Sequence, residues 1–179
     1  MTTWPPAQVI ESRRVQLVPV AVSDAAEMVP VLADPVLYEF IGGRPPTLEQ
    51  LERRYAAQSV GHSEDRAQWW LNWVVRLGES REAVGYVQAT VEDDRSTLEA
   101  SIAWVIAPQF QRRGLGSEAT SAMVDWLRNA GVTRFAASIH PHHDASAALA
   151  RHQGFRPTGT IDDDGEVRWL DGQVNLDET

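Results

Sequence analysis

The residues most able to do chemistry lie in the segment 104–117, which reads WVIAPQFQRRGLGS. An apolar stretch ends at a proline, and two arginines and two glycines then precede a stretch with helical spacing. The first amides of a helix lack partners within it, and the helix dipole makes that end positive. Glycines let the backbone approach a phosphate and adopt positive φ, while Arg112 and Arg113 add full charges. The segment therefore predicts a site for a phosphate-containing ligand, and we expect a diphosphate.

Two other phosphate-binding motifs compete for this segment. Residues 114–119 also fit the G-x-G-x-x-A pattern of dinucleotide-binding folds, which needs an acidic residue about 20 positions later. Ile139 and His140 stand at the end of the next predicted strand instead, and too little chain follows for a doubly wound sheet. A P-loop is excluded, because no Lys-Ser/Thr pair follows the glycines.

Composition limits the class of protein. The 179 residues, 43% of them hydrophobic and 23% charged, predict one globular domain over 1–179 with a frayed tail at 171–179. The net charge of −9 argues against a nucleic-acid partner and is compatible with a cationic substrate. The absence of cysteine excludes a disulfide scaffold, a thiolate metal site and a cysteine nucleophile. We expect a cytoplasmic protein with no membrane partner, because no apolar run has the length of a signal or membrane segment.

The first half of the chain predicts two helices followed by a meander. A capping box of Asp24 and Glu27 opens a helix to about residue 33, and Thr47 caps a second helix to about residue 60. Glycines and prolines make 38–46 a loop. Strands are expected over 15–20, 69–77, 83–92 and 98–107, with turns at 79–82 and 93–96.

The second half alternates between helix and strand. Helical spacing predicts helices over 116–130 and 144–153, closed by Gly131 and Gly154. A strand is expected over 134–139, and a hairpin joins 158–161 to 167–170 through Asp164-Gly165. A meander that leads into this alternation predicts one mixed α/β sheet.

The order of these elements resembles the GNAT superfamily of acyl-CoA-dependent N-acetyltransferases. Gln-x-x-Gly-x-Gly after a strand that ends in Ala-Pro resembles motif A of that family. A second set of residues resembles the family's pattern further on: His140-Pro141, His143, Ser146, Leu149 and Gly154-Phe155. The detailed resemblance covers about 98–159 and is nearest to the branch that includes the ribosomal-protein N-terminal acetyltransferases.

The resemblance implies a GNAT-like, mostly antiparallel sheet flanked by helices, with acetyl-CoA as cofactor. It also implies acetyl transfer, by direct attack, to a primary amine of a small molecule or a peptide N-terminus. Carried over to this sequence, the backbone of Val105, Ile106 and Ala107 would bind the pantetheine arm. The diphosphate and its surroundings would take Gln111, Arg112, Arg113, Gly114, Leu115, Gly116, Ser117 and His143.

Two departures from the family pattern concern the proton donor. His143 stands where many members have Asn, and Ala150 stands where many have a tyrosine that acts as general acid. Ser146 is the candidate that remains for a hydrogen bond to the departing thiolate, although a serine there can also simply cap or pack its helix.

The general base is the second open role. Glu99 shares a strand face with Ser101, where relatives often have Glu, and could act through a water molecule. Glu99 can equally be a solvated carboxylate beside a turn. A peptide α-amine, with a pKa of about 8, is partly neutral already and needs a base less.

The acceptor side is predicted from the aromatic residues. Tyr38, Glu39 and Phe40 lie in a loop that borders the acceptor in the family, and Trp70 faces away from a core-facing row of residues. That row is Trp69, Leu71 and Trp73. His140, His142 and His143 are close in sequence but lack the further ligands that a metal site needs, so no metal is expected.

Two other functions stay open. A non-catalytic acyl-CoA sensor or partner module of the same fold is the first, and the missing tyrosine motivates it. A dinucleotide-dependent oxidoreductase is the second, which tight coenzyme A binding without NAD binding would eliminate. The oligomeric state is also open, with a homodimer as one option.

Overall fold

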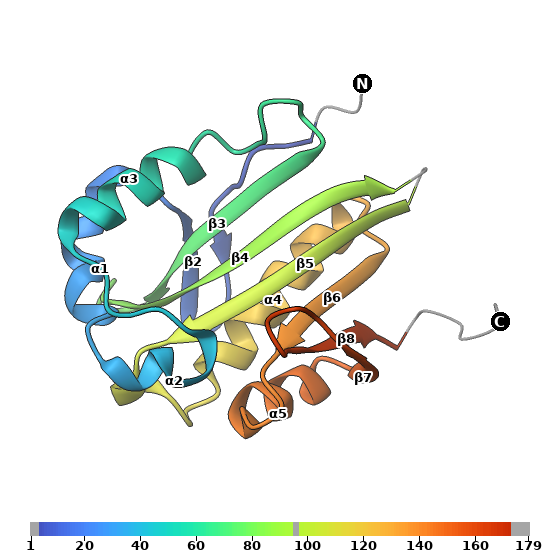
Figure 1. Ribbon diagram of the computed structural model, residues 1–179. Coiled ribbons are helices and arrows are strands. Elements are labelled where there is room, and N and C mark those ends of the chain that lie inside the picture. Colours follow the sequence, from blue (N-terminus) through green and yellow to red (C-terminus); the bar gives the residue numbers. More distant parts are fainter. Residues whose placement is uncertain (1–3, 95–96, 173–179) are drawn as a thin grey trace, which may run out of the picture.

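The computed structural model describes residues 4–94 and 97–172, and eight strands in these ranges form one sheet in the order β1-β2-β3-β4-β5-β6-β8-β7. The strands are β1 (Ile10–Glu11), β2 (Val15–Pro19), β3 (Gln68–Leu77), β4 (Ala83–Asp94), β5 (Thr97–Ile106), β6 (Arg134–Ile139), β7 (Phe155–Ile161) and β8 (Val167–Asp171). The α-helices are α1 (Ala25–Val31), α2 (Tyr38–Ile41), α3 (Leu48–Gln58), α4 (Leu115–Asn129) and α5 (Asp144–His152). Figure 1 shows α1 and α3 on one side of the sheet and α4 behind it. The predicted mixed, mostly antiparallel sheet with flanking helices is confirmed.

The sheet divides at the pairing between β5 and β6. The neighbours β2, β3, β4 and β5 are antiparallel throughout, whereas β5 and β6 run parallel. That parallel pairing covers Glu99 to Ser101 of β5 and ends there, although β5 continues to Ile106. The last five residues of β5 therefore have no β6 partner, and the two strands diverge beyond Ser101 (Figure 1).

The main core lies between the sheet and α4. Met123 and Leu127 of α4 are fully buried in one cluster with Trp73 and Phe135. Leu71 and Trp73 are core residues as predicted, and Trp69 packs partly buried against the same cluster. A smaller cluster on the opposite face joins α1 and α3 to the sheet. This arrangement fixes the start of α4 against the end of β5.

Helix α3 begins as predicted, because the Thr47 side chain accepts from the Gln50 amide and Gln50 in turn caps the Thr47 amide. The capping box expected at Asp24 and Glu27 is wrong. Both carboxylates instead bind the guanidinium of Arg76 on β3, at 2.9 and 2.8 Å. A tertiary ion pair thus uses the side chains that the local pattern assigned to a cap.

Three further predictions change. The loop expected over 38–46 contains α2, which follows a 3-10 turn at Pro35–Leu37. The turn expected over 93–96 is wrong for its first two residues, because β4 runs to Asp94, and 95–96 lie outside the described residues. In the tail, Asp171 ends β8 and is buried, whereas 173–179 lie outside the described residues.

Candidate active site

A cavity of about 790 Å³ lies where β5 and β6 diverge. Its walls come from the end of β5, the start of α4, the start of α5 and the segment around α2. Nine of the predicted cofactor residues line it: Val105, Ile106, Gln111, Arg112, Gly114, Leu115, Gly116, Ser117 and His143. Ala107 and Arg113 are not among its lining residues. The structure thus brings most of the predicted set to one place.

The start of α4 provides the expected cradle for an anion. Gly114 is the N-cap residue, with a φ of 74°, and no side chain caps the helix. Arg112 also has a left-handed backbone, with a φ of 60°, which the sequence did not indicate. Two left-handed residues before a helix leave its first amides open, which suits a phosphate.

Gly116 has a different role from the one expected, because its φ is not positive. A Cβ at Gly116 would lie 3.2 Å from both Ile106 Cγ1 and Leu149 Cδ1. The missing side chain therefore lets α4 pack closely against β5 and α5.

The end of β5 has a backbone that the sheet uses only in part. An edge strand points about half of its amides and carbonyls away from its one partner. Two groups there are already bound: the Ile106 carbonyl accepts from Gln111 Nε2 at 2.7 Å, and the Ala107 amide donates to Val84 at 2.8 Å. The predicted backbone role of Ala107 is therefore not available to its N–H.

The start of α5 places Ser146 and His143 on the cavity wall. The His143 side chain makes no capping bond and instead stacks on Phe40, with ring centroids 4.7 Å apart. Burial lowers the pKa of His143 below its ordinary value, and nearby His140 lowers this pKa further, against the opposite effects of Asp144 and Glu39. His143 is therefore neutral at neutral pH.

Ala150 does not share the cavity with Ser146. It is fully buried in the main core, so position 150 does not face the cavity as the family's tyrosine position was expected to. Leu149, three residues after Ser146, lines the cavity instead. A turn of 3.6 residues lets position 149 face the cavity and position 150 face the sheet.

Glu99 lies apart from these groups. It sits at the paired start of β5 and does not line the cavity. One carboxylate oxygen pairs with Arg134 Nη2 at 3.2 Å, and the other accepts a short hydrogen bond from Arg168. The structure does not bring Glu99 together with Ser146.

The predicted acceptor residues separate into three places. Phe40 lines the cavity, whereas Tyr38 and Glu39 do not. The Tyr38 hydroxyl donates to the Leu32 carbonyl at 2.9 Å, and burial raises its pKa. Trp70 lines a second cavity, of about 660 Å³, at the other end of the sheet.

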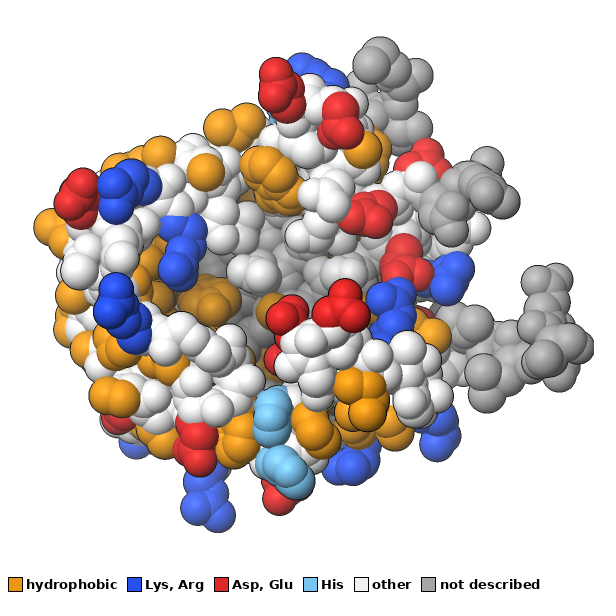
Figure 2. All heavy atoms as spheres, in the orientation of Figure 1, with side chains coloured by type: hydrophobic (Ala, Val, Ile, Leu, Met, Phe, Trp, Pro, Cys, Tyr) orange, Lys and Arg blue, Asp and Glu red, His pale blue; other side chains and the backbone are white. Residues whose placement is uncertain are grey.

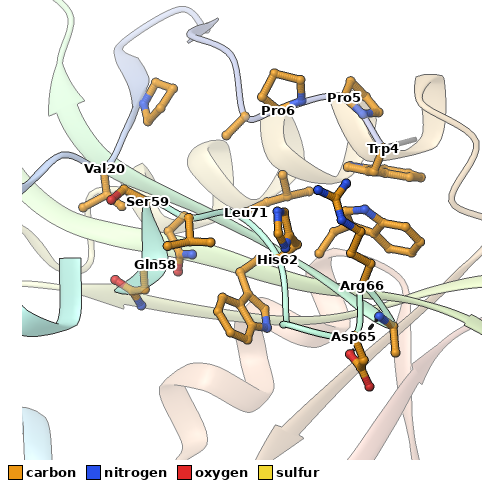
Figure 3. Close-up of a pocket in the computed structure, with 18 of the residues that line it drawn as sticks. Trp4, Pro5, Pro6, Val20, Gln58, Ser59, His62, Asp65, Arg66 and Leu71 are labelled. Atoms are coloured by element: carbon orange, nitrogen blue, oxygen red, sulfur yellow. Dashed lines mark hydrogen bonds between the residues drawn. The ribbon is translucent and has the colours of Figure 1, made fainter. Parts of the chain in front are cut away.

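Figure 3 shows this second cavity between the N-terminal segment and the segment that follows α3. Trp4, Pro5 and Pro6 lie on one side, and Gln58 and His62 lie on the other. No helix begins among its lining residues, so it lacks the cradle described above. Across the described ranges, no group of three or more His, Asp or Glu could hold a metal ion.

The comparisons with known proteins agree with this geometry. The sequence matches the acetyltransferase (GNAT) domain family over residues 14–156, which is most of the chain. The chain belongs to the GNAT acetyltransferase family. The matched residues include all of β5, α4 and α5, the elements that contribute walls to the first cavity. No curated protein matches the sequence.

Solved structures of several acetyltransferases are similar to this one. An acetyltransferase from Thermus thermophilus is 28% identical, with a TM-score of 0.69 over 88% of this chain and 96% of that one. A Salmonella typhimurium acetyltransferase, described as modifying the N-terminal serine of ribosomal protein L7/L12, is 17% identical, with a TM-score of 0.75 over 91% and 96%. A ribosomal L7/L12 α-N-protein acetyltransferase in complex with coenzyme A is 17% identical, with a TM-score of 0.75 over 91% and 95%.

Membership of the GNAT family gives this protein its general activity and cofactor. It is an acetyltransferase, and acetyl-CoA is its cofactor. The predicted enzyme class and cofactor are thereby confirmed. Within the described ranges, no helix combines the length and the apolar character needed to cross a membrane.

Proposed function

We propose that this GNAT protein acetylates a primary amine, and that its preferred acceptor is the α-amine of a peptide N-terminus. One observation carries the proposal: a single cavity contains an open helix N-terminus, a half-paired strand end and, on its wall, both His143 and Ser146. The first two features suit the donor, and the last two suit proton transfer to and from an amine and a thiol.

The donor end of the cavity is the start of α4. The amides around Gly114 and the positive end of the helix dipole would hold the diphosphate, and Arg112 adds a charge at the rim. The free side of Val105 and its neighbours would bind the pantetheine amides as a strand would. Acetyl-CoA supplies an activated thioester at the end of that arm.

A proton acceptor is needed if the amine arrives charged. The titratable side chains that line the cavity within the described ranges are Arg112, His142, His143 and Asp144. Of these, His143 combines partial burial with a lowered pKa. A neutral imidazole can accept a proton, so His143 takes the role that Glu99 is not placed to fill.

Ser146 supports the leaving group in this proposal. Its position one turn into α5 and on the cavity wall lets its hydroxyl donate to a thiolate. A free thiol has a pKa of about 8.5, so a hydrogen bond in place of full protonation is enough for it to leave.

The acceptor preference rests on charge and on the relatives. Figure 2 shows a hollow over the open face of the sheet, with carboxylates gathered on the side of the β7–β8 hairpin. The chain carries a net charge of −9. Both features favour an amine, and the Salmonella relative is described as acting on a peptide N-terminus.

An acceptor panel with acetyl-CoA tests the proposal. We expect release of CoA thiol, with acetylation of peptides that have a free N-terminus and not of the same peptides with a blocked one. Polyamines, aminoglycosides and free amino acids complete the panel. Transfer to a lysine side chain or an aminoglycoside would overturn the acceptor preference. Tight CoA binding without release for any amine would favour a non-catalytic acyl-CoA-binding module.

A further inference from the structure

We propose that Arg14, about 100 residues before α4 in the sequence, is a positioning residue that aims the Gly114 amide at the diphosphate. This inference rests on the placement of acetyl-CoA described under the proposed function. Arg14 lies just before β2 and does not line the cavity. Its effect on the cofactor therefore has to pass through the groups that it binds.

The first of these groups is a carbonyl in the cradle itself. Arg14 Nη1 donates to the carbonyl oxygen of Arg113 at 2.8 Å. In a trans peptide the carbonyl and the following N–H point in opposite directions. Because the Arg113 carbonyl is turned toward Arg14, the N–H of Gly114 is turned away from it. Gly114 lines the cavity, so this N–H faces the side where the diphosphate would lie.

The left-handed backbone of the cradle needs such support. Arg112 has a φ of 60°, a left-handed conformation that is unfavourable for a residue with a side chain. A Cβ on Gly114 would lie 3.2 Å from Arg14 Nη2, so the guanidinium packs directly against this loop. Among the described residues, none accepts a hydrogen bond from the Gly114 N–H. The amide is held in place and still free for a ligand.

The second group is Glu118, in the first turns of α4. Its Oε1 accepts from the Arg14 amide at 2.7 Å and from the Ser12 hydroxyl at 3.0 Å, and its Oε2 accepts from Arg14 Nε at 2.7 Å. Burial alone would raise the pKa of Glu118, but these bonds outweigh it and the pKa is lowered. Glu118 therefore stays charged, and its charge is directed at Arg14.

This pairing also removes an electrostatic conflict. A free carboxylate near the start of α4 would compete with a phosphate for the positive end of the helix. Glu118 does not line the cavity, and the guanidinium of Arg14 opposes its charge. Arg14 thus orients one amide of the cradle and opposes the charge of the acid in the first turns of α4.

The fork of the guanidinium is essential, because one side chain reaches both Glu118 and the Arg113 carbonyl. Lysine keeps the charge but cannot reproduce two directed bonds in one plane. The test is therefore Arg14→Lys, with Arg13→Lys as its control, since Arg13 is an exposed neighbour. CoA affinity is measured by calorimetry, and pantetheine affinity by displacement of CoA. Pantetheine lacks the diphosphate, so it reports general damage to the cavity.

We expect Arg14→Lys to weaken CoA binding by roughly ten- to a hundredfold, the range of one hydrogen bond to a charged group, and to leave pantetheine binding unchanged. Arg13→Lys should change neither affinity. Glu118→Gln keeps the bond between Arg14 and the Arg113 carbonyl, so it should lose less CoA affinity than Arg14→Lys. It replaces Arg14→Lys as the test variant if Arg14→Lys does not fold. Unchanged CoA affinity in both variants, or equal losses for CoA and pantetheine, would overturn the proposal. No acceptor is present in this assay, so its outcome is independent of whether an amine is acetylated.

Discussion

The imidazole of His143 lies against the ring of Phe40, with the two planes inclined by 25°. Phe40 belongs to α2 and His143 directly precedes α5, so this contact joins two segments about 100 residues apart in the wall of the cavity. Burial is the largest cause of the lowered pKa of His143. The phenyl ring is therefore part of what keeps the imidazole neutral.

Removing the ring should move the pH dependence of the reaction. In Phe40→Ala, His143 gains water and its pKa rises toward the ordinary value of 6.5. The acid limb of the kcat/KM profile should then shift to higher pH, and NMR titration of the imidazole should shift in the same direction. Phe40→Leu retains more of the burial and should shift less. An acid limb that survives unchanged in His143→Gln would exclude His143 as the proton acceptor.

Gly85, on β4, should tolerate a side chain less than the other glycines of the described residues. A Cβ there would stand 2.0 Å from the Val105 carbonyl oxygen and 2.9 Å from Ile106 Cα, both in the backbone. Gly85→Ala should therefore cost more than the 1–3 kcal/mol of ordinary overpacking, because β5 must move. Denaturant unfolding measures this cost, and CoA calorimetry should show weaker binding. Gly78→Ala is the control, since its Cβ would meet nothing closer than 3.4 Å. Equal stability of the two variants would contradict the expectation.

Ser146→Ala should slow turnover at saturating acetyl-CoA and amine. The loss of one hydrogen bond to a charged sulfur is worth about 1.5–3 kcal/mol, or roughly ten- to a hundredfold in rate. CoA affinity should change less, because the thiolate develops during the reaction. Wild-type turnover in this variant would reassign Ser146 to packing.

The same variant allows a second comparison. Adding Ala150→Tyr should not restore the rate, because residue 150 lies in the core and a tyrosine there overpacks it. A lower melting temperature is the expected result. Partial recovery of turnover would mean that the side chain at 150 reaches the cavity after all.

Glu99→Gln should change stability and not rate. The neutral amide loses the ion pairs with Arg134 and Arg168, which are about two-fifths exposed, so we expect a loss of about 1 kcal/mol. Denaturant unfolding and steady-state kinetics at several pH values measure the two quantities. A large fall in kcat at unchanged stability would return Glu99 to the role of general base.

Local sequence signals were sufficient for much of the fold. The Thr47 cap and the spacing of Leu51 and Tyr55 predict α3 well, because both signals lie within the helix that they describe. The helix start at Gly114 follows from the glycine spacing in the same way, whereas the left-handed backbone of Arg112 has no local signal. The short α2 was not predicted, because one helical turn among glycines and prolines has no periodicity.

The contacts that required a structure are those between distant residues. Arg14 and Glu118 are 104 positions apart, and neither carries a local pattern that names the other. Arg76 is 52 positions from Asp24 and 49 from Glu27, so the local spacing of the two acids did not indicate their partner. The orientation of the His143 ring depends on its contact with Phe40, and a helix pattern around residue 144 cannot include that contact. Sequence spacing predicts which segments form the site, and tertiary packing decides which side chains face it.

Because the end of β5 beyond Ser101 has no β6 partner, the stability of the fold should depend on the concentration of the ligand that binds there. A strand edge without a partner leaves part of the folding free energy unrealised, and a ligand that pairs with it acts as an extra strand. By mass action, a ligand at a hundredfold excess over its Kd adds about 2.7 kcal/mol to the free energy of unfolding. The resistance of this chain to heat and to proteolysis would then follow the concentration of CoA around it. Without CoA, the same protein would unfold at a lower temperature and be cleaved by proteases more readily.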